Sequence, residues 1–493
     1  MLCLLPQIAL SFALDAQQPK LSPLPTEADH YQLIEITAPS DALVEAGGIL
    51  PMDDNRVMTC TRRGEIWIIE NAYSDQPVYK LWTDGLQEPL GLFEHDGWIY
   101  CATRGELVRI KDSDNDGRAD VFETVSDDWA ISGNYHEYLF GPRLDQEGNF
   151  WLTSNKPFGG QPFGAVDWRG WAFKIGKDGV TQPVCAGLRS PAGIEVSPWG
   201  DVFYTDNQGE WCGANKLSLL TPGDFHGHPH GIQSAKLPQS QVKFPGDIPD
   251  GIMMPEAAKT IPGFKLPAVW FPYDKMGRSA SGIAWDQTAG TFGPFAGQVF
   301  VGDQYQASVS RVFLEQVDGT WQGACFPFRR GLISGITRIR FAPNGELLVG
   351  GTDRGWGGLG RKSAGLERIQ YTGQLPFEIL SMQAMPFGFR LCFTMPVDGN
   401  TAMNPKSWTM RSFTYELHSA YGSDEMDVAD LEVIPSHLSE DGLQLDLHVS
   451  GLREGYVHEL RAPAVRRAGN QNQPLLHDYA SYTLLKIPAG QKK

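Results

Sequence analysis

The most specific chemical motif in the sequence is an acidic stretch, DSDNDGRADVFE, between positions 112 and 123. As a twelve-residue calcium loop it places side-chain oxygens at alternating positions and puts a glycine at the sharp turn. The expected ligands are Asp112, Asp114, Asp116, the backbone carbonyl of Arg118, Asp120 and Glu123. Hard carboxylate oxygens suit Ca²⁺ rather than Zn²⁺. Because strand-like and loop-like residues flank the motif, it predicts a structural Ca²⁺ site between strands; the alternative is an acidic turn without metal.

A second candidate is His136, which precedes a strand-like run in NYHEYLFGPRLDQEGNFWLTSN. A single histidine is more often a hydrogen-bonded structural residue than a catalytic one. Its place in a Gly, Asn and Tyr segment at the start of a strand favours a site, because loops on a rigid scaffold carry function. We therefore keep both interpretations of His136, a general base and a structural side chain.

A third candidate lies in GLRSPAGIEVSPWGDVFYTDNQGEW, which runs from position 187 to position 211. Arg189 stands on a short turn, and a guanidinium held in this way suits a planar anionic group. The alternative is a surface ion pair. A polar turn, DNQGE, follows the next strand and contributes Asp206, Asn207, Gln208 and Gly209.

Three alternating histidines, His226, His228 and His230, form the segment HGHPH. On an extended strand they would share one face and could bind a metal. The intervening Gly227 and Pro229 favour a turn instead.

The elements that must position these residues are visible as a repeat in which a glycine precedes an aromatic-rich strand. Six copies begin at Gly64, Gly97, Gly148, Gly200, Gly297 and Gly345. This spacing is irregular but centred on the ~40–50 residues of a four-stranded propeller blade. The long interval after Gly200 is rich in Pro, Gly and His, which favours an elaborated loop over a seventh blade.

The strand-like segments YQLIEI and LERIQY stand at either end of the repeats and are expected to close the ring. The sequence thus predicts an all-β chain, with a six-bladed β-propeller over residues 28–372. Beyond it, strand-like runs separated by turns predict a β-sandwich of immunoglobulin-like size over residues 376–493. No acid/base pair stands out in this second domain, so we expect it to be a packing or docking module.

Composition supports this picture, since 55 Gly and 34 Pro with 25 Phe, 15 Tyr and 14 Trp favour short strands over long helices. The net charge of −17 argues against a nucleic-acid partner. No apolar stretch after residue 15 approaches the ~20 residues of a transmembrane segment.

The first fifteen residues, MLCLLPQIALSFALD, resemble the apolar part of a secretory signal without its basic start. We expect a signal segment at residues 1–16 and a periplasmic or secreted protein; the alternative is an untargeted tail. Six cysteines remain after Cys3, at long intervals, and either disulfides or buried free thiols would fit.

HEYLFGPRLDQEGNFWLTSN, GLRSPAGIEVSPWGDVFYTDNQGEW and PGDFHGHP together resemble the soluble quinoprotein glucose and sorbosone dehydrogenases, and more closely the dehydrogenase-like propellers of planctomycete-type bacteria. The resemblance covers the propeller region. It implies a six-bladed propeller with pyrroloquinoline quinone on its axis and calcium beneath the quinone. By position it implies that His136 is the general base, that Arg189 stacks on the cofactor, and that the DNQGE turn neighbours the cofactor's calcium.

The chain departs from the family pattern at three places. Ser190 stands where the family has an asparagine. The segment GDQYQASVSRV, where the family has a lysine, contains Gln304 and Tyr305 but no lysine. The paired arginines that the family has in a late blade correspond to Arg338 and Arg340, at shifted spacing. Arg338 is the expected cofactor ligand of this pair. Each charge-assisted hydrogen bond lost to a tricarboxylate would cost about 1.5–3 kcal/mol.

Three functions follow as hypotheses. The first is an exported oxidoreductase that oxidises a sugar or polyol hydroxyl and passes electrons to a separate acceptor, a cytochrome or a quinone, because the sequence has no haem-attachment motif. The second is a cofactor-free propeller that binds carbohydrate or protein. The third is a calcium-dependent hydrolase or lactonase on the same scaffold.

Overall fold

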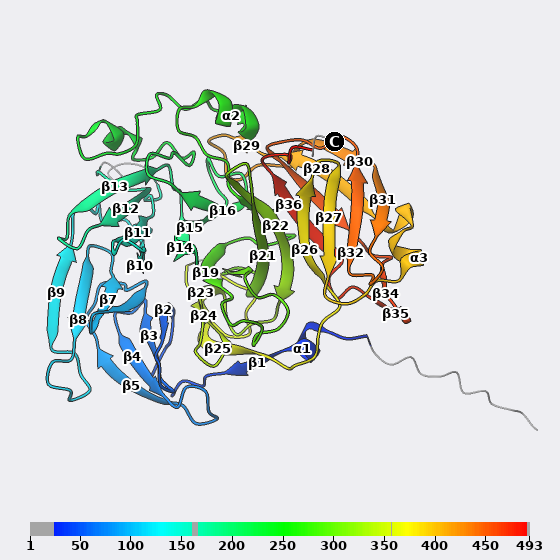
Figure 1. The fold of residues 1–493 in the computed structure, drawn as a ribbon. Coiled ribbons are helices and arrows are strands. Elements are labelled where there is room, and N and C mark those ends of the chain that lie inside the picture. The colour runs from blue at the N-terminus through cyan, green and yellow to red at the C-terminus, as the bar shows by residue number, and fades with distance from the viewer. Residues whose placement is uncertain (1–23, 160–165, 356, 491–493) are drawn as a thin grey trace, which may run out of the picture.

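The computed structural model describes residues 24–159, 166–355 and 357–490, so the expected signal segment at 1–16 lies outside the described residues. The described chain is nearly all β-structure and forms many small antiparallel sheets, an arrangement consistent with a β-propeller (Figure 1). A single short helix, α1 (Glu27–His30), precedes the first strand.

The first three four-stranded sheets follow the chain in order. The first contains β2 (Ala46–Pro51), β3 (Val57–Thr61), β4 (Ile66–Glu70) and β5 (Val78–Thr83). The second contains β6 (Leu92–His95), β7 (Trp98–Ala102), β8 (Leu107–Lys111) and β9 (Val121–Ser126). The third contains β10 (Leu139–Leu144), β11 (Phe150–Ser154), β12 (Trp171–Ile175) and β13 (Thr181–Ala186).

Three further four-stranded units complete the series. The fourth contains β14 (Pro191–Val196), β15 (Val202–Asp206), β16 (Asn215–Leu220) and β18 (Val269–Phe271). The fifth contains β19 (Ala280–Trp285), β20 (Val299–Asp303), β21 (Ser308–Val317) and β22 (Thr320–Arg329). The sixth contains β23 (Ile336–Phe341), β24 (Leu347–Thr352), β25 (Ala364–Tyr371) and β1 (Tyr31–Glu35).

The first strands of these units form a closed circle of contacts, from β2 through β6, β10, β14, β19 and β23 back to β2. The circle closes through the N-terminal strand, since β1 pairs antiparallel with β25 and places Tyr31 opposite Tyr371. This is the pairing expected of YQLIEI and LERIQY. Tyr31 is buried against Phe292 and Phe328, so closure also buries aromatic surface.

The six repeat glycines all have positive φ, between 74° and 104°, which only glycine adopts without strain at a tight turn. Five of them introduce the second strand of a unit: β7, β11, β15, β20 and β24. Gly64 instead introduces β4, the third strand of its unit. This different place explains why the interval from Gly64 to Gly97 is short.

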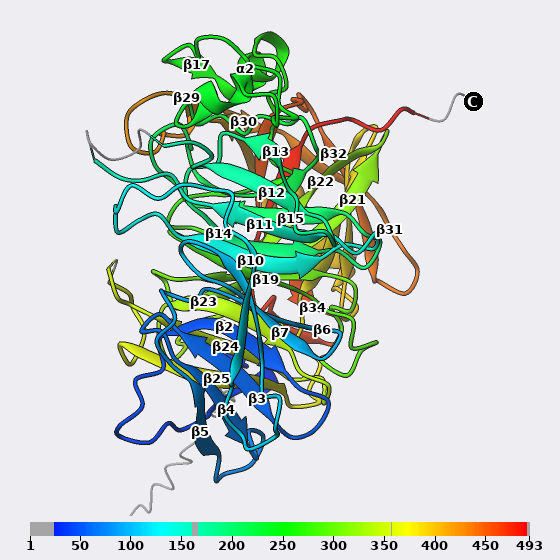
Figure 2. The same cartoon turned by 90° about the vertical axis from the view of Figure 1, so that its left-hand side faces the viewer.

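The long interval before β18 is an excursion, as the sequence indicated. It forms the 3₁₀ helix η1 (Ile232–Lys236), the short strand β17 (Ile252–Met253) and the helix α2 (Met254–Thr260). Met254 and Ala257 of α2 are buried in one apolar cluster with Tyr415 of the C-terminal region. In both views α2 and β17 lie beside β29 (Glu416–Leu417) (Figures 1 and 2).

The C-terminal region has two larger sheets. One contains β26 (Ile379–Met385), β27 (Gly388–Phe393), β32 (Gln444–Val449) and β31 (Val433–Leu438). The other extends β22 through β36 (Tyr479–Leu484), β33 (Tyr456–Arg461), β28 (Thr409–Thr414) and β30 (Met426–Leu431), giving an eight-stranded sheet. Smaller elements are α3 (Gly399–Ala402), η2 (Pro405–Ser407), β34 (Arg466–Arg467) and β35 (Asn470–Pro474).

The C-terminal region is therefore continuous with the ring rather than tethered to it. Cys325 of β22 pairs with Ser481 of β36, and residues of β22 share one apolar core with both C-terminal sheets. The six cysteines of the described ranges carry free thiols, which decides between the two interpretations left open above. In the part of the chain that the structure describes, no helix is long and apolar enough to cross a membrane.

Candidate functional site

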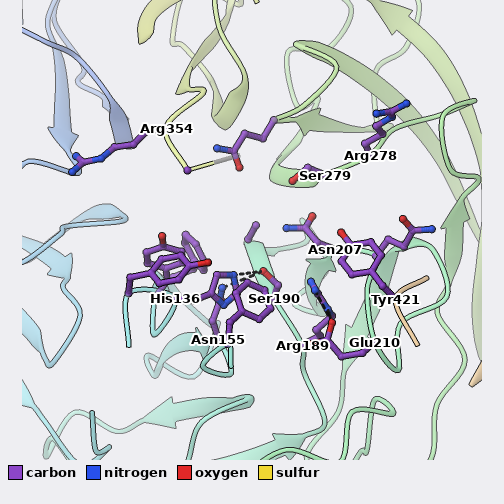
Figure 3. A pocket seen from close by; sticks show the side chains of 18 of the residues that line it. His136, Asn155, Arg189, Ser190, Asn207, Glu210, Arg278, Ser279, Arg354 and Tyr421 are labelled. Carbon is purple, nitrogen blue, oxygen red and sulfur yellow. Dashed lines mark hydrogen bonds and ion pairs between the residues drawn. The ribbon is translucent and has the colours of Figure 1, made fainter. Parts of the chain in front are cut away.

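A cavity of about 370 Å³ is lined by residues of the first, third, fourth, fifth and sixth units and of the C-terminal region (Figure 3). Segments far apart in the sequence line it, including the candidates His136, Arg189, Asn207 and Gln208. Its size is within the range of small-molecule sites, roughly 300–1,000 Å³. The structure thus brings the histidine and the arginine of the sequence analysis into one cavity.

The ring of His136 is fixed by a chain of hydrogen bonds. Its Nδ1 donates to the carbonyl of Lys156 at 2.9 Å, because a carbonyl only accepts, and Nε2 is therefore left as an acceptor. Nε2 faces the hydroxyl of Ser190 at 3.3 Å, and Asn155 donates to the same hydroxyl at 3.2 Å (Figure 3). The ring also stacks on Phe158. Burial lowers the pKa of His136 to about 3, so the imidazole is neutral and Nε2 carries a free lone pair.

The Arg189 guanidinium is held by an ion-pair network. Its Nε and Nη2 donate to one carboxylate oxygen of Glu210 at 3.0 and 2.8 Å, and the other oxygen pairs with Lys156. The guanidinium carbon also lies 5.1 Å from the ring centroid of Phe158. Burial by itself would raise the pKa of Glu210, but Arg189 and Lys156 outweigh it and lower the pKa to about 2.

The DNQGE turn supports this arginine from behind. Asp206 is fully buried and accepts hydrogen bonds from the backbone N–H groups of Arg189 and Ser190 at 3.0 and 2.7 Å. At Gly209, a Cβ would lie 1.9 Å from Nε of Arg189, so only glycine leaves room for the guanidinium. Asp206 and Gly209 therefore shape the site without lining the cavity, in contrast to Asn207 and Gln208.

Arg338 lies below the cavity and does not line it. Its guanidinium spans the axis and donates to the carbonyls of Gly47, Leu90 and Ala192 at 2.6–2.9 Å, which joins the first, second and fourth parts of the ring. Burial lowers the pKa of Arg338 to about 9. The N–H groups of Arg338 that were expected to bind a cofactor instead donate to backbone carbonyls, because the side chain lies across the channel.

Three other arginines line the cavity and were not assigned from the sequence: Arg62, Arg278 and Arg354. Arg278 precedes β19 of the fifth unit and forms an ion pair with Asp274. The sequence does contain a pattern that could have found Arg62 and Arg354. An arginine and a glycine follow the second strand of three units, in TRRG at 61–64, TRG at 103–105 and TDRG at 352–355. Combined with the glycine repeat, this pattern predicts that these arginines lie at the same end of the ring.

Tyr421 is the most unexpected lining residue, because it comes from the C-terminal region. Its ring centroid lies 5.2 Å from the guanidinium carbon of Arg189, on the far side of Arg189 from His136 (Figure 3). The expectation that the C-terminal domain only packs or docks is incomplete. Nothing local in HSAYGSD distinguishes it from a surface turn, so the sequence carried no signal.

The acidic loop lies between β8 and β9, at the outer side of the second unit and away from the cavity lining. Ligand oxygens of Asp112, Asp114 and Asp116 gather within 4.8 Å of one another. Asp112 Oδ1 is buried without a hydrogen-bond partner among the described residues. Asp120 instead accepts from Ser113, and Glu123 pairs with Arg109. The structure therefore places three of the six expected ligands together and engages Asp120 and Glu123 elsewhere.

The three HGHPH histidines do not converge. Across the described ranges, no other trio of His, Cys, Asp or Glu side chains gathers as closely as the acidic loop. The rings of His228 and His230 lie 6.3 Å apart, and His226 packs on Tyr204. Burial lowers the pKa of each, so all three stay neutral in the segment predicted as a turn.

The lining residues fit a compact anionic cofactor with a bound cation. Four guanidiniums face the cavity, and the amide oxygens of Asn155 and Asn207 are buried there without hydrogen-bond partners in the described chain. Amide oxygens are ligands for Ca²⁺, and guanidiniums pair with carboxylates.

No known family model matches the chain, and no curated protein matches it in sequence. Similar solved structures include an oxidoreductase (glucose dehydrogenase) from Thermus thermophilus, with 17% identity, 69% of this chain and 99% of that chain covered, and a TM-score of 0.49. The PQQ-bound aldose sugar dehydrogenase of Streptomyces coelicolor has 13% identity and a TM-score of 0.46, and the match covers 71% of this chain and 99% of that chain. A carbohydrate-active enzyme of family AA12 from Trichoderma reesei has 11% identity and a TM-score of 0.49, and the match covers 72% of this chain and 100% of that chain. At these identities and scores, the similarities carry no information about what this chain binds.

Proposed function

We propose that the chain is an exported oxidoreductase that oxidises a sugar or polyol hydroxyl with a pyrroloquinoline-type quinone bound in the cavity. The observation that carries this proposal is the orientation of His136. Its Nδ1 is committed to the Lys156 carbonyl, and its Nε2 acceptor is turned toward Ser190 at the cavity wall. A neutral imidazole held in one tautomer is what proton abstraction from an alcohol requires.

In this mechanism a substrate hydroxyl takes the place of the Ser190 hydroxyl at Nε2 and gives its proton to His136. The Lys156 carbonyl stabilises the imidazolium that forms, and Glu210, already shared by Arg189 and Lys156, limits the extra positive charge around it. A bound quinone would supply the hydride acceptor for oxidation at the alcohol carbon.

Arg189 and Arg278, with Arg62 and Arg354 at the rim, would hold the carboxylates of the cofactor. Asn155, Asn207 and Gln208 would offer oxygens to its calcium. A second Ca²⁺ would bind Asp112, Asp114 and Asp116 as a structural tie. Arg338 is left out of the ligand set because its donors already bind backbone carbonyls.

The architecture that accompanies this function is also a proposal. The six four-stranded units would count as six blades over residues 28–372, followed by an immunoglobulin-like sandwich over residues 376–493. The periplasmic or secreted location and the signal segment at 1–16 rest on the sequence alone. Electrons would pass to a separate cytochrome or quinone.

A second candidate is a cofactor-free propeller that binds carbohydrate or protein. One observation favours it: each guanidinium that lines the cavity already has a carboxylate partner. The pairs are Arg62–Glu88, Arg189–Glu210, Arg278–Asp274 and Arg354–Glu45. An incoming polyanion would have to displace or share these partners.

The two candidates are separated by titrating the purified protein with pyrroloquinoline quinone and Ca²⁺ while absorbance is recorded. Dye reduction with a panel of aldoses and polyols follows on the loaded protein. Saturable quinone binding with sugar-dependent dye reduction supports the oxidoreductase. Sugar binding without quinone binding would establish the second candidate instead.

A further inference from the structure

The segment between β29 and β30, residues 418–423, crosses from the C-terminal region onto the DNQGE turn. Its backbone is fixed there at three points: Trp211 N–H donates to the His418 carbonyl at 2.8 Å, Gly422 N–H to the Gly209 carbonyl at 3.0 Å, and Ser423 N–H to the Gly213 carbonyl at 2.9 Å. We call this segment the strap. Three hydrogen bonds over six residues make it a rigid element.

The strap is also anchored from outside the turn. Ser419 donates from both its N–H and its hydroxyl to the carboxylate of Asp250, in the excursion that precedes α2. The β29 strand at its start pairs with β17 of the same excursion. The excursion and the fourth unit therefore hold the strap from two sides.

Tyr421 stands at the centre of this rigid strap, yet its side chain is not buried by it. The residue is 54% exposed, lines the cavity, and lies over Arg189. Among the described residues its hydroxyl has no hydrogen-bond partner. A fold that fixes the backbone so firmly and leaves an aromatic ring facing a cavity presents that ring to a ligand.

The chemistry of the ligand follows from the neighbours of the ring. One face of the Tyr421 ring lies over Arg189, and Ser279 and Gln304 are neutral hydrogen-bonding side chains that line the same cavity. An aromatic ring beside neutral polar groups suits a sugar ring, whose C–H face packs on an aromatic ring while its hydroxyls are hydrogen-bonded.

We infer that Tyr421 of the C-terminal domain is a substrate-contacting, specificity-determining residue, against which the ring of a sugar in the cavity packs. This inference rests on the proposed function for the identity of the site. It gives the C-terminal domain a direct part in substrate choice.

The test compares Tyr421→Ala and Tyr421→Phe with the wild type, using Tyr456→Ala as a control that removes a tyrosine ring of the same domain outside the cavity lining. Quinone affinity is measured by absorbance titration, and KM and kcat are measured for cyclic sugars and for acyclic polyols. We expect Tyr421→Ala to raise KM for cyclic sugars about 5- to 20-fold, since an aromatic contact is worth about 1–2 kcal/mol. Acyclic polyols and quinone affinity should change less than twofold, and Tyr421→Phe should behave as the wild type.

A uniform change of KM for cyclic and acyclic substrates, or no change, would overturn the inference. If the loaded wild type oxidises no sugar, the proposed oxidation fails, and calorimetric sugar binding to the wild type and Tyr421→Ala then decides the role of Tyr421. Equal sugar affinity of the two proteins, or no sugar binding by either, counts against it. A cooperative thermal transition within a few degrees of the wild type verifies that the variant is folded.

Discussion

The acidic loop and the cavity are assembled over very different stretches of chain. Asp112, Asp114 and Asp116 lie within five consecutive positions, and one turn brings their oxygens within 4.8 Å. The cavity joins His136 and Arg189 with Tyr421, which lies more than two hundred residues further along the chain, and the three meet only through the ring and the strap. The loop depends on local geometry, whereas the cavity depends on every sheet closing correctly.

This difference predicts how each site responds to change. Substitution of one ligand in the acidic loop should abolish ion binding there without affecting the rest of the molecule. The cavity should respond to substitutions far from it, wherever the ring or the C-terminal junction is held together.

The largest effect is expected for His136→Gln, which removes the proton acceptor and keeps a polar side chain. Dye reduction should fall about 100- to 10,000-fold, the usual contribution of a general base. Quinone affinity should stay within a few-fold. The control is His95→Gln, which alters a histidine on β6 outside the cavity lining. Full activity of His136→Gln would disprove the base assignment.

Next is Arg338→Met, which tests whether the axial arginine holds the sheets together. We expect a loss of about 2–5 kcal/mol in the free energy of unfolding, because three buried carbonyls lose their donors. Denaturant unfolding measures it, with Arg56→Met as control, since that arginine makes an exposed ion pair. Equal destabilisation by both variants would remove the proposed role.

A pH effect is expected at His477, which joins the N-terminal segment to the C-terminal domain by contacts with Glu27 and Glu378 at 3.0 and 2.6 Å. Burial would lower its pKa, but the two carboxylates raise it to about 9. The folded state therefore binds the proton more tightly than the unfolded chain. The resulting stability is fully present below about pH 6.5 and is lost as the pH rises through about 9.

Melting temperature measured from pH 6 to pH 10 checks this prediction. The wild type should lose stability between pH 7 and pH 9.5 by more than the His477→Gln variant does. His437→Gln, which changes an exposed histidine of the same domain, should follow the wild type. Parallel curves for all three proteins would show that this contact does not set the pH dependence.

The smallest effects separate two residues of the acidic loop. Asp112→Asn should abolish the rise in melting temperature on adding Ca²⁺, a stabilisation of about 2.7 kcal/mol at a hundredfold excess over Kd. Glu123→Gln should keep most of it, because Glu123 is engaged in an exposed pair with Arg109 worth about 1 kcal/mol or less. If both variants lost the Ca²⁺-induced rise in melting temperature equally, Glu123 would be a calcium ligand after all.

The sequence alone determined the strands and the local loop. Positive-φ glycines ahead of aromatic strands, the alternation in YQLIEI and LERIQY, and the carboxylates of DSDNDG are signals carried within a few neighbouring residues. Even so, the copy at Gly64 marks a third strand rather than a second, because every hairpin turn of a blade uses the same chemistry.

Only the tertiary structure decided the partners of the side chains. Arg338 spans the axis, Glu123 pairs across two strands, and Tyr421 reaches the cavity from the far domain. Each of these contacts depends on sheet closure or domain packing, which join residues that no local pattern relates. The site is thus a property of the closed ring and the strap, while its individual residues are properties of the sequence.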